Sequence, residues 1–289
     1  MRRTTILAGA VATVATTFGA APGALAANAV FGGGTNSGEA IVVNANKAAA
    51  KLKSAVVAWE ATCGDGSRFP WSSAVTVSKT SAGFSAGPRE LATTRNGKKR
   101  FSGVQRFALD GGDSAASVAV NLAGRLAAKR ASGTLSADIK ILDKASGAVQ
   151  ETCRTGSVRW KASRSPGRVY AGKTSQDQPF VARVDGRRKR VTDVLMGWSA
   201  PCQPEGFMTF PEQLSNFTLA ASGRFGDTWD QTVKMDDGGS RKFDYTLTGR
   251  LSRRSGAGTF RAAVAGTDAG GATRETCDTG AVTWKAATG

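Results

Sequence analysis

The residue types that carry most enzyme chemistry are scarce in this sequence. The chain has no histidine, so it lacks the commonest general base, the commonest metal ligand and the usual partner of a serine or cysteine nucleophile. No serine lies three residues before a lysine, and no glycine-rich loop ends in Gly-Lys-Ser or Gly-Lys-Thr. We therefore expect no catalytic residue, no cofactor and no metal centre.

Carboxylate pairs are the alternative source of chemistry, since two acids can hydrolyse a glycosidic bond when the fold sets their separation. Glu151 and Glu275 are the candidates, because each lies two residues before a cysteine in matching sequences. The structural interpretation of the same residues is a solvated strand position or an ion-pair partner. A carboxylate-dependent polysaccharide hydrolase is thus the alternative function.

Three clusters of basic residues could bind anions through charge-assisted hydrogen bonds. Gly186 precedes the second cluster, which predicts a hairpin tip that carries its charges into solvent. Each cluster has two interpretations: a binding surface for phosphates or acidic sugars, or a solvated turn that keeps the protein soluble. The clusters are Arg95, Lys98, Lys99 and Arg100; Arg187, Arg188, Lys189 and Arg190; and Arg253 and Arg254.

The overall charge agrees with an anionic partner. The chain carries a formal charge of +17, and removal of Arg2 and Arg3 with a signal peptide leaves +15. A charge this far from zero favours contact with anionic polymers. We expect wall polymer or acidic polysaccharide in preference to nucleic acid, because the second cluster contains no aromatic residue on which bases could stack.

The chain begins with the pattern of a secretory signal peptide. Met1, Arg2 and Arg3 precede an apolar stretch, and Ala24-Leu25-Ala26 is a small-residue cleavage site. No later apolar stretch reaches the roughly 18 residues that span a bilayer, so no transmembrane segment is expected after signal removal. The sequence therefore predicts a secreted, extracellular protein, with association with the cell wall as a finer expectation.

An internal repeat covers the region after the signal peptide. The sequence ETCRTGSVRWKAS at 151–163 recurs as ETCDTGAVTWKAA at 275–287. A tryptophan lies four residues before a cysteine in both copies, at Trp59 and Trp198. This self-similarity predicts two copies of one domain.

Four cysteines in an exported chain predict two disulfides. Because each copy holds two of them, we expect Cys63 to pair with Cys153 and Cys202 with Cys277. Each bond would tie an early strand to the last one and stabilise its domain by about 4 kcal/mol. A zinc site is the alternative, but no two cysteines have the close spacing of zinc ligands and no histidine is present.

Short runs of alternating apolar and polar residues, separated by turn sequences, predict strands. Val118–Leu122 is one such run, and Asn96-Gly97 and Asp237-Gly238-Gly239 are typical hairpin turns. The pattern predicts an all-β protein of two tandem antiparallel β-sandwich domains, Ig-like or jelly-roll-like, each with one disulfide. Residues 45–54 are the segment that could form a helix, with a hairpin turn as the alternative.

Composition and the repeat together set the expected boundaries. Glycine and proline mark the flexible segments, and the connection between the domains is long enough to permit motion. The expected order is a signal peptide at 1–26, a flexible leader at 27–37, a first domain at 38–163, a linker at 164–176 and a second domain at 177–289.

The repeated pattern resembles that of exported tandem β-sandwich repeat proteins of high-GC Gram-positive bacteria, most of them uncharacterised. The resemblance rests on LAGRL at 122–126, GTL at 133–135 and CRTGSVRW at 153–160, with their second copies. It implies a β-sandwich fold and an extracellular setting, and it supplies no catalytic residues. We therefore expect a non-catalytic exported binding or structural protein that associates with an anionic cell-surface or extracellular polymer.

Overall fold

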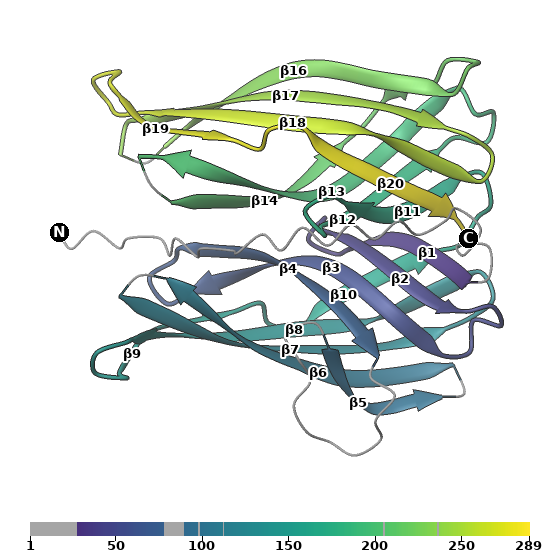
Figure 1. Ribbon diagram of the computed structural model, residues 1–289, viewed down its shortest axis with the longest axis horizontal. Helices are drawn as coiled ribbons and strands as arrows, with labels where there is room; N and C mark the ends of the chain where they lie inside the picture. The colour runs from purple at the N-terminus through teal and green to yellow at the C-terminus, as the bar shows by residue number, and fades with distance from the viewer. Residues whose placement is uncertain (1–27, 78–89, 98, 112, 205, 236) are drawn as a thin grey trace.

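The protein is built from strands throughout the part of the chain that its computed structural model describes (Figure 1). That part comprises residues 28–77, 90–97, 99–111, 113–204, 206–235 and 237–289. The signal peptide expected at 1–26 lies outside it, as does Lys98. The strands form two sheets, one for each repeat, and this confirms the predicted all-β fold of two domains.

The first sheet is a meander that closes on itself. Neighbouring strands follow the order of the chain, and β10 pairs with both β1 and β8. The pairings are antiparallel except for a short parallel contact between β4 and β5. Residues 45–54 belong to the hairpin between β2 and β3 and not to a helix. The strands are β1 (Asn28–Thr35), β2 (Ala40–Asn46), β3 (Leu52–Cys63), β4 (Arg68–Val77), β5 (Glu90–Gly97), β6 (Arg100–Gly111), β7 (Ser114–Leu126), β8 (Arg130–Asp143), β9 (Val149–Arg154) and β10 (Val158–Ser163).

The second sheet repeats this path, with β20 paired to both β11 and β18, but in the described part of the chain the edge between β14 and β16 is not bridged. Within the described residues, β16 pairs with β17 alone, so it has no counterpart of the β5–β6 pairing. The strands are β11 (Val169–Thr174), β12 (Pro179–Val184), β13 (Arg190–Gln203), β14 (Phe207–Leu214), β15 (Phe217–Thr218), β16 (Arg224–Lys234), β17 (Ser240–Leu251), β18 (Ser255–Thr267), β19 (Thr273–Asp278) and β20 (Val282–Thr288).

Each domain holds the disulfide that the repeat predicts. Cys63 on β3 is bonded to Cys153 on β9, and Cys202 on β13 is bonded to Cys277 on β19. In both domains the two cysteines are also register partners in the sheet. The bond therefore joins an early strand to the second-last strand of its domain, and not to the last one.

The repeated glycines make room for a buried tryptophan in each domain. Gly124 on β7 is the register partner of Gly133 on β8, which in turn pairs with Trp160 on β10. A Cβ atom added at Gly124 would lie 2.6 Å from Cζ2 of the tryptophan, and one added at Gly133 would lie 2.7 Å from it. The second domain repeats this row with Gly249, Gly258 and Trp284.

Two segments that were expected to be flexible are strands instead. β1 lies within the expected leader at 27–37, between β2 and β10, and β11 lies within the expected linker at 164–176, between β12 and β20. Their glycines allow close approach of a neighbouring strand: a Cβ atom at Gly33 or Gly172 would lie 1.9 Å from a carbonyl oxygen. The same glycines made both segments look like loops in the sequence.

The two domains pack against each other through an apolar interface. Side chains on the outer faces of β1 and β2 meet those of β11, β12 and β13, and Gly32 lies within this contact because an added Cβ atom would be 2.9 Å from Cβ of Ala171. The connection between the domains is therefore not a flexible tether. The buried interface residues are Val30, Ala40, Val42, Val169, Ala171, Val181 and Leu195.

Candidate functional site

The hairpin between β12 and β13 holds the densest basic cluster at a fixed position. Asp185 closes the turn, since its Oδ1 accepts the backbone N–H of Lys189 at 2.8 Å. The guanidinium of Arg188 turns back onto the domain and donates to the hydroxyl of Tyr170, at 2.7 Å, and to the carbonyl oxygen of Gly167. Arg188 therefore anchors the hairpin, while the other three basic residues of the cluster are exposed.

This hairpin meets other basic turns at one end of the molecule, where the C-terminus also lies (Figure 1). Nη2 of Arg188 lies 3.4 Å from the carbonyl oxygen of Ser252, at the turn between β17 and β18. The backbone N–H of Arg164 donates to the carbonyl oxygen of Lys129 at 2.9 Å, which joins the connection between the domains to the turn between β7 and β8. We call this region the basic end. Its cations are Lys47, Lys51, Lys99, Arg100, Lys129, Arg130, Arg164, Arg168, Arg187, Arg188, Lys189, Arg190, Arg253 and Arg254.

Charge is segregated between the two ends of the strands. Asp185 is the one carboxylate in the described turns of the basic end, and none of the basic-end cations forms an ion pair with a described carboxylate. At the opposite end, aspartates lie at the turns after β3, β6, β8, β16 and β18. Several cations there form ion pairs, as Arg274 does with Asp237 at 2.7 Å.

The clusters predicted from the sequence are brought together in part. The second and third clusters are neighbours in the basic end of the second domain. Lys99 and Arg100 lie at the same end of the first domain, where the backbone N–H of Lys99 donates to the carbonyl oxygen of Ala50 at 3.0 Å. Arg95 lies on β5 as the register partner of Ser102, and Lys98 is outside the described residues.

Sequence reasoning missed several members of the basic end. Lys129 and Arg130 lie in a hairpin with few charges, and Arg164 and Arg168 lie in the segment interpreted as a linker. In an antiparallel meander, alternate turns fall at the same end of the sheet. The order of the strands and turns along the chain therefore contains the signal that these cations and the recognised clusters lie at the same end of the sheet.

The matching glutamates do not form a catalytic pair. Oε1 of Glu151, on β9, accepts the backbone N–H of Gly64 at 2.9 Å within the first domain. Glu275, on β19 of the second domain, is bound by Nε of Arg241 at 2.6 Å. Figure 1 shows β9 and β19 in different domains, so these two carboxylates do not face one substrate. The contacts agree with their structural interpretation.

Among the described residues, one group of side chains that are able to bind metals lies close together: Cys202, Glu275 and Cys277. The two sulfur atoms are bonded to each other, so neither is a thiolate that could bind a metal. The carboxylate is engaged by Arg241. This group therefore does not offer a metal site.

A half-buried carboxylate in the second domain lies among aromatic rings. Nε1 of Trp198 lies 3.4 Å from Oε2 of Glu212, and the hydroxyl of Tyr245 is a second partner. Burial raises the pKa of Glu212, and these two hydrogen bonds oppose the effect. Burial and the neighbouring Glu212 also raise the pKa of Tyr245. In the first domain Ser73 takes the place of Glu212 and binds Nε1 of Trp59 at 3.0 Å.

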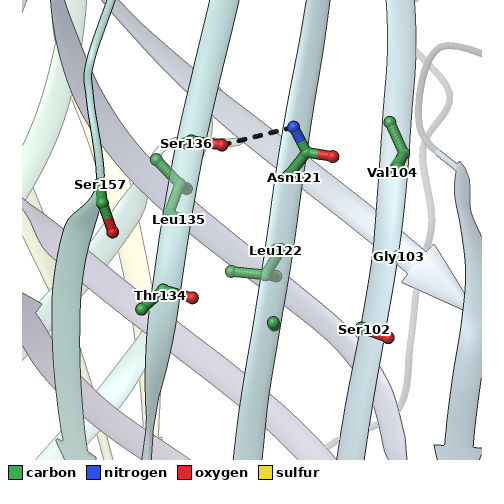
Figure 2. A pocket seen from close by; sticks show the side chains of 10 residues that line it. Ser102, Gly103, Val104, Asn121, Leu122, Thr134, Leu135, Ser136 and Ser157 are labelled. Atoms are coloured by element: carbon green, nitrogen blue, oxygen red, sulfur yellow. Dashed lines mark hydrogen bonds between the residues drawn. The ribbon is translucent and has the colours of Figure 1, made fainter.

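A shallow groove of about 260 Å³ crosses the outer face of β6, β7 and β8 (Figure 2). Ser102, Thr134 and Ser136 contribute hydroxyl groups, and Nδ2 of Asn121 donates to Oγ of Ser136 at 3.3 Å. The side chains that line the groove carry no charge. The groove can donate and accept hydrogen bonds, but it offers neither a catalytic acid or base nor a cation for an anionic ligand.

No protein-family model matches the chain, and no curated protein matches it. Among the described residues there is no helix that is long and apolar enough to span a membrane. The two disulfides are compatible with an oxidising compartment outside the cell.

Proposed function

We propose that this protein is a non-catalytic exported binding or structural protein that holds an anionic polymer, such as wall polymer or acidic polysaccharide, through its basic end. The observation that supports the proposal is the gathering of cations from turns of both domains, none of which forms an ion pair with a described carboxylate. Apart from Arg188, whose guanidinium anchors its hairpin, such cations keep their charge and their N–H donors available for phosphate or carboxylate groups. Their spread across two domains suits an extended polymer.

Salt-titrated retention on immobilised polymers tests this function. The panel consists of wall polymer, acidic polysaccharide, DNA and a neutral glycan. A variant with Arg187→Gln, Lys189→Gln and Arg190→Gln removes three exposed charges but keeps Arg188, which anchors the hairpin. We expect about tenfold weaker retention on the preferred anionic polymer and a smaller dependence on salt, because fewer counterions are released on binding.

A matched control removes the same charge elsewhere. Arg154, Arg261 and Arg274 form exposed ion pairs outside the basic end, and such pairs contribute little to stability. Their replacement by glutamine should leave retention nearly unchanged. An equal loss in both variants would mean that net charge, and not the basic end, attracts the polymer. Absence of retention on every anionic polymer at low salt would overturn the proposal.

A further inference from the structure

A cleft of about 510 Å³ lies between the two domains. The first domain contributes the turn between β1 and β2 and the strand β10, and the second contributes β12, β13 and β14. The floor includes Leu195, which belongs to the apolar interface and is 4% exposed. Leu195 packs closely against Gly34, since a Cβ atom added there would lie 2.9 Å from its Cδ1. The cleft is thus preformed by the docking of the domains.

The cleft contains two cations, Arg159 and Lys161, whose charges no carboxylate in the described part of the chain neutralises. Its one lining carboxylate, Asp193, is bound by Nη1 of Arg183 at 2.7 Å and by Nε2 of Gln213 at 3.4 Å. Arg159 and Lys161 form no ion pair with a described carboxylate. Among the side chains that line the cleft, positive charge therefore exceeds negative charge.

The strand geometry directs these two cations outward together. Arg159 and Lys161 flank Trp160 on β10, whose side chain is buried on the inner face of the sheet. Residues two apart on a strand share a face, so both cations project from the outer face. Asn36 fixes the adjacent turn, because its Oδ1 accepts the backbone N–H of Arg159 at 2.7 Å and its own N–H donates to the Arg159 carbonyl oxygen at 2.8 Å.

We propose that this cleft binds a single oxyanion-bearing unit, namely the carboxylate of a sugar acid or the phosphate of a polyol phosphate. The guanidinium of Arg159 can bind two oxygens of such a group, and Lys161 adds a point charge. Asn36 and Gln213 bring amide groups suited to neighbouring hydroxyls. The volume falls in the range of small-ligand sites, which occur preferentially at domain interfaces.

The cleft is connected to the basic end by one strand. β10 continues from Lys161 to Ser163, and Arg164 follows in the basic end. At about 3.3 Å per residue, the distance from Arg159 to Arg164 is about 16 Å. One polymer could therefore contact both the cleft and the basic end. The assignment of the ligand in the cleft rests on the proposed function for this reason. The cleft would recognise one unit of the polymer that the basic end attracts.

Titration with short soluble ligands, followed by NMR of the isotope-labelled protein, tests the cleft separately from the polymer. The probes are digalacturonate, glycerol phosphate and neutral digalactose. We expect saturable shifts of the Arg159 backbone amide and the Asn36 side-chain amide with one or both anions and none with digalactose. Comparison of digalacturonate with glycerol phosphate distinguishes the two sources of the oxyanion.

A paired variant makes the test specific. Arg159→Thr combined with Lys161→Gln should weaken binding of the short anion at least tenfold, and threonine is the residue at the matching position of the second domain, Thr283. Lys285→Gln changes the lysine that corresponds to Lys161 but lies outside the cleft, so it should leave the affinity unchanged.

The outcomes separate this proposal from the proposed function. Absence of shifts with both short anions, or unchanged binding by the paired variant, would overturn the cleft assignment even if the basic end still retains polymer. Binding of a short anion that the paired variant loses, by a protein that no anionic polymer retains, would support the cleft and overturn the proposed function alone.

Discussion

At the scale of single residues, the packing of each buried tryptophan depends on glycine at the neighbouring register positions. A Cβ atom at Gly249 would lie 2.3 Å from Cζ2 of Trp284 and 2.7 Å from Cε1 of Phe225. Gly249→Ala should therefore destabilise the protein by about 1–3 kcal/mol through overpacking, measured as a lower midpoint of urea unfolding. Gly270→Ala is the control, because its Cβ atom would lie 3.4 Å from the nearest heavy atom; equal losses in both variants would refute the steric explanation.

Glu212 makes the stability of the second domain depend on pH. Burial raises its pKa in the folded protein, so the folded state holds this proton more tightly than the unfolded state does. The contribution of Glu212 to the free energy of unfolding therefore falls as pH rises from the ordinary carboxyl range through the raised pKa. At neutral pH the ionised carboxylate destabilises the folded protein. Glu212→Gln should raise the thermal midpoint at pH 7 and change it little at pH 4. Calorimetry at both pH values checks this, and a larger gain at pH 4 would contradict it.

At the scale of elements, alternation and the internal repeat predicted most of the architecture but not its first strand in either domain. Spacing predicted the cysteine pairing because each copy contains one early and one late cysteine. The sequence did not predict β1 and β11 as strands, because glycines such as Gly33 and Gly172 are typical of turns. In the structure these glycines are required by close contact with a neighbouring strand. Each basic cluster could be recognised in the sequence, but the proximity of the clusters depends on which turns lie at the same end of the sheet. The burial of Glu212 could not be predicted either, because it depends on packing between strands that are distant in the sequence.

The strand β1 provides a test of the corrected boundary. A chain that begins at Gly38, the boundary expected from the sequence, lacks Phe31, whose side chain is fully buried in the first core. Burial of one such side chain contributes about 1.5–3 kcal/mol, and the loss also leaves β2 and β10 without their shared partner. We expect this chain to unfold at a lower temperature and less cooperatively, as followed by circular dichroism, than a chain that begins at Asn28. Equal melting of the two chains would show that β1 is dispensable.

At the scale of the whole molecule, the interface leads us to expect that the two domains unfold as one cooperative unit. The continuous apolar run Ile41-Val42-Val43 in the sequence indicates such an interface. A strand that is covered on both faces does not alternate between apolar and polar residues. That run alone does not say which surface covers the second face. The structure shows that the covering surface is the outer face of the duplicated domain.

A charge placed in this interface should uncouple the domains. Val181 is 1% exposed, so Val181→Asp would bury a carboxylate among apolar side chains at a cost of several kcal/mol. The unaltered protein should show one calorimetric transition, and the variant two. Val149→Asp is the control, because Val149 is 52% exposed and lies outside the interface. Two transitions in the unaltered protein would contradict the coupling.

The position of the C-terminus has a practical consequence. The backbone N–H of Thr288 donates to the carbonyl oxygen of Arg254 at 3.0 Å, so the chain ends among the cations of the basic end. A molecule attached to a surface by that end would stand upright on it, with the aspartate-bearing turns farthest from the surface. An affinity tag or fluorophore at the C-terminus would then be shielded by the surface, whereas a label on the turn after β18, at Gly270, would remain accessible to antibody or quencher.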